Sequence, residues 1–104
     1  MGKELRNVVI VDAGRSAFGR GARGKLVATR LDDAAAQVLR ELIERNPKLD
    51  PAMIEDVGMG QVGSASELAG IGSDNVKKLA GLPQETATFQ TNRQCGSSME
   101  TLHR

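Results

Sequence analysis

The spacing of apolar residues along the chain predicts alternating strands and helices. Residues 8–11 form a continuous β-branched run without polar alternation, which is typical of a strand buried on both faces of a parallel sheet. Asp32 and Asp33 open a segment of helical periodicity and Arg45 closes it, which matches the charge of a helix dipole. A helix is therefore predicted near residues 30–45, with an apolar stripe of Leu31, Ala35, Val38, Leu39, Leu42 and Ile43.

Prolines and glycines mark the boundaries of the next elements. The two prolines within residues 46–51 cannot continue the first helix. Residues 54–62 then indicate a second strand, in which larger side chains alternate with glycines. A glycine-broken segment leads to a short helix near residues 74–80, with Asp74 as its N-cap and Gly81 as its C-terminal stop.

The last part of the chain completes the alternation. Residues 86–91 indicate a third strand. Ser97 and Glu100 have the spacing of a capping box, so a third helix is expected to begin at Ser97 or Ser98. The resulting order β-α-β-α-β-α predicts an α/β fold with a mostly parallel sheet and right-handed crossovers.

The composition argues against a nucleic-acid-binding, membrane-spanning or secreted protein. Its 104 residues make about one small domain, and its net charge of +1 predicts no general affinity for nucleic acid or an anionic membrane. No apolar run is long enough to span a membrane, and residues 1–9 lack the apolar stretch of a secretory signal. Because a single cysteine cannot form an internal disulfide, the cytoplasm is the expected compartment.

Two sets of glycines match the G-x-G-x-x-G spacing of a dinucleotide-binding loop. That motif needs its glycines directly after a strand and at the opening of a helix. The first set begins well beyond the first strand, and the second lies partly within the second strand. We therefore interpret them as a flexible loop and as close backbone packing; they are Gly19, Gly21 and Gly24, and Gly58, Gly60 and Gly63.

The stretch GRGARGKL, residues 19–26, also approaches a phosphate-binding P-loop. Leu26 stands where that motif needs a Ser or Thr to hold magnesium, and no helix follows directly. Its arginines and Lys25 could touch a phosphate, but the composition favours a solvated or interface loop.

Cys95 is the stronger candidate for chemistry. It lies between the third strand and the third helix, where a helix N-terminus favours a thiolate and backbone N–H groups can bind an oxyanion. Gly96 leaves room beside the sulfur for a substrate. A lone cysteine is also often a small buried apolar residue, so the spacing alone leaves a nucleophile and an inert core residue as open alternatives.

No partner base for Cys95 is evident in the sequence. His103 comes eight residues later and would lie about two turns along the third helix, too far to take the thiol proton directly. We interpret it as a surface or packing residue. The chain holds too few His, Cys and clustered carboxylates for a metal site.

Together these stretches resemble the thiolase family. Residues 8–20, VVIVDAGRSAFGR, are similar to the opening strand and loop, and residues 31–62 to the first helix, turn and second strand. The stretches LAGLP and TATFQTNRQCGSSME resemble the second helix end and the nucleophile segment, with N-R-x-C-G-S at residues 92–97 as the specific part. The match covers only the front portion of a thiolase, so residues 1–104 are expected to be an incomplete N-terminal domain ending in the helix after Cys95.

The resemblance implies an acyl-CoA acyltransferase that condenses or cleaves 3-ketoacyl-CoA thioesters. Cys95 would take the acyl group as an enzyme thioester, and its backbone N–H would help to hold the oxyanion. Coenzyme A would be a substrate, with no permanently bound cofactor. The activating histidine, the second cysteine and the main CoA-binding loop of the family match no residue of this chain. The resemblance also implies a homo-oligomer in which the strand before Cys95 pairs with its copy in a second subunit.

Departures from the family pattern leave an alternative of another class. Ala17 stands where a proline is usual, and residues 72–78, GSDNVKK, replace the usual segment before the second helix. These differences bear on subunit contacts and loop packing. Since the chain supplies neither a base nor a second thiol, the alternative is a non-catalytic fragment or assembly module of a thiolase-like protein.

Overall fold

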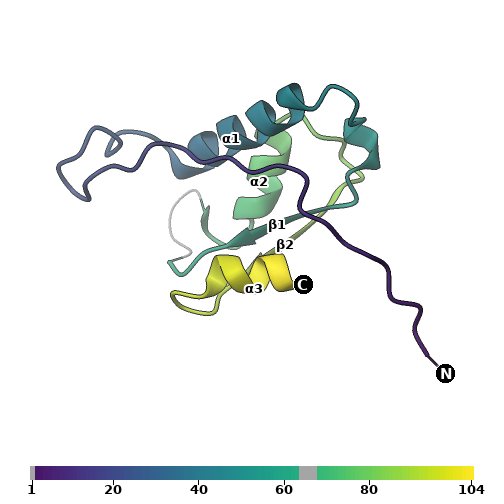
Figure 1. Cartoon of the computed structure of the whole chain (residues 1–104). Helices are drawn as coiled ribbons and strands as arrows, with labels where there is room; N and C mark the ends of the chain where they lie inside the picture. Colours follow the sequence, from purple (N-terminus) through teal and green to yellow (C-terminus); the bar gives the residue numbers. More distant parts are fainter. Residues whose placement is uncertain (1, 64–67) are drawn as a thin grey trace.

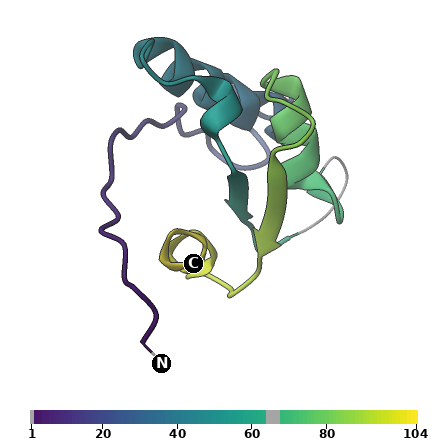
Figure 2. The same ribbon diagram turned by 90° about the vertical axis from the view of Figure 1, so that its right-hand side faces the viewer.

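The computed structural model describes residues 2–63 and 68–104 and shows an α/β arrangement in three layers (Figure 1). The sheet lies in the middle, with two helices on one side and the last helix on the other (Figures 1 and 2). In chain order the elements are α1 (Leu31–Arg45), the single-turn 3-10 helix η1 (Pro51–Met53), β1 (Asp56–Gly60), α2 (Gly72–Leu79), β2 (Ala87–Thr91) and α3 (Ser97–His103).

The two strands pair in parallel, as the alternation of elements predicts. The register runs from Asp56 opposite Ala87 to Gly60 opposite Thr91. The Gln61 N–H extends the ladder by donating to the Thr91 carbonyl at 3.0 Å. Both predicted strands are confirmed with shorter bounds, as Asp56–Gly60 and Ala87–Thr91.

The end of α2 confirms the predicted stop at Gly81. Gly81 has a positive φ of 77°, a conformation that glycine adopts without a steric penalty. Its N–H donates to the Lys78 carbonyl at 3.0 Å, and the Leu82 N–H donates to the Lys77 carbonyl at 3.2 Å. This pair of bonds is a Schellman motif, which satisfies the last carbonyls of the helix.

The predicted start of α2 is wrong. The helix begins at Gly72 with Ile71 as its N-cap, so Asp74 lies inside the first turn. There the carboxylate pairs with Lys78 at 2.6 Å and with Lys77 at 3.2 Å, and these partners hold the pKa of Asp74 below its ordinary value. The side chain therefore serves ion pairs within the helix, where a capping role was expected.

The predicted helix over residues 30–45 is confirmed as α1, but its buried side differs from the expected stripe. Ala36 and Asp32 are its buried residues, because this side faces α2. Arg30 donates two hydrogen bonds to Asp32, at 3.1 and 2.9 Å, and these hold the pKa of Asp32 low although burial opposes them. The expected stripe is only half-buried or, at Leu31, exposed.

The predicted first strand is wrong. Residues 8–11 form no strand, and their exposed fractions run from 74% to 90%. A strand needs a neighbour for its N–H and C=O groups, and within the described residues β1 pairs only with β2. A β-branched composition favours a strand but cannot form one alone. The observed order is therefore α-β-α-β-α, without the opening strand.

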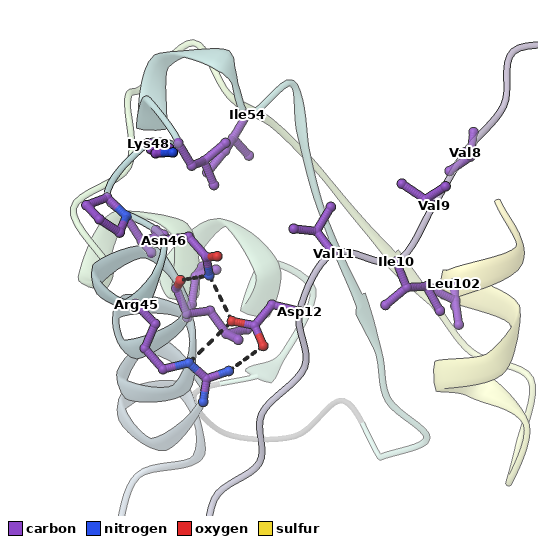
Figure 3. A pocket seen from close by; sticks show the side chains of 15 residues that line it. Val8, Val9, Ile10, Val11, Asp12, Arg45, Asn46, Lys48, Ile54 and Leu102 are labelled. Carbon is purple, nitrogen blue, oxygen red and sulfur yellow. Dashed lines mark hydrogen bonds and ion pairs between the residues drawn. The ribbon is translucent and has the colours of Figure 1, made fainter.

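The segment before α1 is attached to the rest of the molecule at Asp12. Its carboxylate accepts hydrogen bonds from Arg45 and Asn46 at the end of α1, which hold the pKa of Asp12 well below its ordinary range (Figure 3). Residues 8–12, the end of α1 and Leu102 of α3 together line an apolar groove of about 790 Å³. The apolar side chains of residues 8–11 remain exposed along this groove.

The hydrophobic core is small. Among the described residues, the buried apolar side chains are Ala36, Leu68, Val76 and Leu82. The radius of gyration is 14.9 Å, against about 13 Å expected for a compact chain of this length. Residues 64–67 of the glycine-broken segment lie outside the described residues. In the part that is described, no helix has the length and apolar character needed to cross a membrane.

Candidate functional site

Cys95 lies in a tight turn between β2 and α3. Its thiol is free and exposed, which removes the alternative of an inert core residue. Gly96 follows as the N-cap of α3, and its carbonyl accepts the Glu100 N–H at 3.0 Å to close the first helical turn. The side chain is thus presented to solvent where the strand gives way to the helix, as the sequence predicts.

The turn has a constrained backbone. The Gly96 N–H donates to the Arg93 carbonyl at 3.0 Å, so Gln94 and Cys95 are the two central residues of a β-turn. Gln94 has a φ of 50°, in the left-handed region that non-glycine residues rarely adopt. The side-chain oxygen of Asn92 accepts the Gln94 N–H at 3.1 Å and supports this conformation.

Ser97 ties the turn together from the helix side. Its side chain is buried, and its Oγ accepts the Arg93 N–H at 2.9 Å and donates to the Gln94 carbonyl at 2.6 Å. The Ser97 N–H donates to the same carbonyl at 3.1 Å. A buried serine hydroxyl therefore contacts the peptide unit between Asn92 and Arg93 and the one between Gln94 and Cys95.

The predicted capping box is wrong, although α3 does begin at Ser97. The N-cap is Gly96, which makes no side-chain capping bond. Glu100 pairs with Arg93 at 3.0 Å and with Arg104 at 3.9 Å. The serine hydroxyl bonds backward into the turn because the positive φ at Gln94 brings that carbonyl within reach.

Two glycines of β1 allow α3 to lie close to the sheet. A Cβ on Gly58 would come within 2.7 Å of the Thr101 side chain, and a Cβ on Gly60 within 2.5 Å of the Ser97 carbonyl carbon. This confirms the interpretation of the second glycine set as close backbone packing for those two residues. Among the described residues, a Cβ on Gly63 would meet no atom within 4 Å, so Gly63 shows no such packing there.

The first glycine set and the near P-loop lack the context that nucleotide binding needs. Residues 21–28 form successive turns, and α1 begins only at Leu31. A Cβ on Gly24 would overlap the Arg20 carbonyl oxygen, so this glycine permits a tight turn. The interpretation of the first glycine set as a flexible loop stays a prediction.

The other predicted site features have these outcomes. His103 is exposed at the last residue of α3, which confirms its interpretation as a surface residue. Over residues 2–63 and 68–104, no group of three or more His, Cys, Asp or Glu side chains could hold a metal ion. Sequence reasoning missed the backbone role of Ser97, for which the only signal was a serine two residues after the cysteine.

Comparison with known proteins identifies the class to which this fold and turn belong. Residues 8–104 match the family model of the thiolase N-terminal domain, so the chain belongs to the thiolase family. The chain is 43% identical over 99 residues to a 3-ketoacyl-CoA thiolase of Aliivibrio salmonicida, which covers 95% of this chain and 26% of that protein. It is 40% identical over 103 residues to a 3-ketoacyl-CoA thiolase of Vibrio parahaemolyticus, covering 99% of this chain and 26% of that protein.

The match is nearly complete for this chain and partial for its relatives. The chain spans about a quarter of the length of the curated relatives that it matches. The family and the α/β fold are therefore established for these residues. What the whole protein does is a separate question.

Proposed function

We propose that the protein carrying this chain is a thiolase-type acyl-CoA acyltransferase, with Cys95 as its acyl-accepting nucleophile. The observation that carries the proposal is the exposed Cys95 thiol, held in a hydrogen-bonded turn within the N-R-x-C-G-S segment. Residues 1–104 would be the front part of the N-terminal domain and end with the helix that follows the nucleophile.

The proposed first half-reaction transfers an acyl group to the sulfur. The Cys95 sulfur attacks the thioester carbonyl of an acyl-CoA, a new sulfur–carbon bond forms, and the bond to the coenzyme A sulfur breaks. The proton lost from the Cys95 thiol ends on coenzyme A, so the step balances. The backbone N–H of Cys95 would hold the oxyanion of the tetrahedral intermediate.

In the second half-reaction of condensation, an acetyl-CoA carbanion attacks the thioester carbonyl, a carbon–carbon bond forms, and the bond to the Cys95 sulfur breaks to give 3-ketoacyl-CoA. Thiolysis is the reverse: the Cys95 sulfur attacks the C3 carbonyl of 3-ketoacyl-CoA, the C2–C3 bond breaks to release acetyl-CoA, and the acyl group then passes from Cys95 to coenzyme A. His103 is the single histidine of the chain and lies exposed at the far end of α3, so the activating base would come from elsewhere in the complete protein. Coenzyme A is thus a substrate, and a homo-oligomeric state and a cytoplasmic location belong to the same proposal.

Acyl labelling tests the proposal directly. The complete polypeptide is mixed with acetyl-CoA, quenched in acid and digested with trypsin, which releases residues 94–104 as one peptide. We expect this peptide to gain one acetyl mass in the wild type and none in Cys95→Ser. An unlabelled wild type, or the same labelling of the protein in Cys95→Ser, would overturn the proposal.

A second candidate, an assembly module without activity, is favoured by one observation. Residues 8–11 expose a continuous apolar run that pairs with no strand among the described residues. Mixing the chain with the remaining portion of a related 3-ketoacyl-CoA thiolase separates the two candidates. Thiolysis that appears only on mixing supports the enzyme, whereas tight association without activity supports the assembly module.

A further inference from the structure

The Ser97 hydroxyl contacts the same peptide unit that contains the Cys95 N–H. Ser97 is 4% exposed, and its Oγ donates to the Gln94 carbonyl at 2.6 Å. The Gln94 carbonyl and the Cys95 N–H belong to one planar amide group, in which they point in opposite directions when the bond is trans. No cis peptide occurs among the described residues. Anchoring the carbonyl therefore fixes the direction of the N–H.

The Cys95 N–H itself is available. Within the described parts of the chain, it donates to no backbone or side-chain acceptor. An unpaired N–H beside a nucleophile can receive a hydrogen-bond acceptor from a substrate. Its usefulness depends on a fixed direction, because an oxyanion must lie about 3 Å from the donor.

The backbone of the turn would not keep this direction unaided. The positive φ of Gln94 is disfavoured for a residue with a Cβ, because the Cβ crowds the backbone in this conformation. Asn92 restrains the N–H of Gln94, while Ser97 restrains its carbonyl and the Arg93 N–H. Without the Ser97 hydroxyl, the Gln94 carbonyl loses its shorter hydrogen bond, at 2.6 Å, and keeps only the bond from the Ser97 N–H, at 3.1 Å. The peptide between Gln94 and Cys95 is then held less firmly against rotation.

We propose that Ser97 is a positioning residue for acyl transfer: through the peptide between Gln94 and Cys95, its hydroxyl aims the Cys95 N–H at the oxyanion. The inference rests on the proposed function, since it concerns acylation of Cys95 by an acyl-CoA. Ser97 does not touch the reacting atoms. It acts through the amide group that it holds.

Two reactions of the same sulfur separate this role from a general effect on the fold. Acetylation by acetyl-CoA passes through a tetrahedral oxyanion, which needs the aimed N–H. Alkylation by iodoacetamide displaces iodide at a saturated carbon and forms no oxyanion. A residue that only aims the N–H should therefore affect acetylation and leave alkylation unchanged.

The experiment measures both rates on the tryptic peptide 94–104 of the complete polypeptide. In Ser97→Ala we expect acetylation to fall about 10- to 100-fold, up to the loss seen when an oxyanion donor is removed, with alkylation within about twofold. Ser98→Ala is the matched control, because Ser98 is exposed on the next position of the helix. It should leave both rates unchanged.

A second pair of variants keeps the test decisive if Ser97→Ala does not fold. Ser97→Thr and Ser97→Val have nearly the same shape and differ by the hydroxyl, so Thr should acetylate faster while both alkylate equally. The role of Ser97 would be overturned if Ser97→Ala were acetylated as fast as the wild type and Ser97→Thr no faster than Ser97→Val. It would also be overturned if acetylation and alkylation fell by the same factor. A wild type that is alkylated but never acetylated would overturn the proposed function as well.

Discussion

Gly60 of β1 lies directly against Ser97, the first residue of α3. A Cβ built on Gly60 would fall 2.5 Å from the Ser97 carbonyl carbon and 2.5 Å from the Ser98 nitrogen. Both atoms are backbone, so they cannot yield by a change of rotamer. The absence of a side chain at residue 60 thus sets how closely the turn that carries Cys95 approaches the sheet.

Gly60→Ala should therefore destabilise the chain. The added methyl group must displace the first turn of α3 or the strand beneath it, and overpacking of this kind costs about 1–3 kcal/mol. We expect the free energy of unfolding in urea, followed by circular dichroism, to fall by that amount.

Gly63→Ala is the matched control for this prediction. A Cβ on Gly63 meets no atom of the described residues within 4 Å, so the substitution should change the stability by no more than about 0.5 kcal/mol. Equal stabilities of the two variants would show that α3 does not depend on the close approach at Gly60.

The buried ammonium group of Lys77 links α2 to the segment before β2. Its side chain is 6% exposed, and Nζ donates to the carbonyls of Gln84 at 3.0 Å and Thr86 at 2.9 Å. Lys77→Met keeps the aliphatic stem and leaves these carbonyls without their donor. We expect a loss of about 1–3 kcal/mol in the free energy of unfolding.

Lys78 provides the comparison for Lys77 within the same helix. It also pairs with Asp74, but its side chain is 62% exposed. Lys78→Met should cost no more than about 1 kcal/mol, as expected for a surface ion pair. If the two methionine variants unfold at the same urea concentration, the carbonyl contacts of Lys77 contribute little.

The sequence predicted correctly those helices and turns that are determined by residues near one another in the chain. The helical spacing within α1 and the αL glycine after α2 depend on residues near in sequence, and both predictions are confirmed. The run at residues 8–11 failed because strand formation depends on a partner distant in sequence. Periodicity describes a face of an element and does not say what covers it.

The candidate site shows the same difference between local features and those that depend on packing. The sequence predicted that Cys95 precedes a helix, but it did not predict whether the thiol is exposed, since burial depends on packing. The spacing of Ser97 and Glu100 predicted a capping box, but the hydroxyl bonds to Gln94. A glycine or asparagine at residue 94 would have signalled the positive φ that causes this, and a glutamine does not.

The Asp12 carboxylate should make stability depend on pH. Its bonds to Arg45 and Asn46 lower its pKa in the folded state, so it stabilises the fold wherever it is ionised. The contribution is complete above the unfolded pKa of about 4 and is lost as the pH falls through the lowered folded pKa.

Asp12→Asn isolates this contribution. We expect the wild type to exceed the variant in free energy of unfolding at pH 7, and the difference to shrink in increasingly acidic buffer. Urea titrations of both proteins across this range provide the measurement. A difference that does not vary with pH would mean that the charge of Asp12 plays no part in holding the segment to α1.

The exposed apolar run at residues 8–11 should promote self-association. Val9 is 74% exposed and Val11 81% exposed, and within the described residues β1 leaves one edge unpaired. An apolar segment beside an open strand edge favours contact between chains. We expect the sedimentation coefficient of the wild type to rise with concentration, and that of the double variant Val9→Lys, Val11→Lys to stay constant.

Met53→Lys is the control: it removes an exposed apolar side chain outside this segment and should associate like the wild type. A wild type whose sedimentation coefficient does not change with concentration would contradict the prediction, because the exposed apolar run would then cause no self-association.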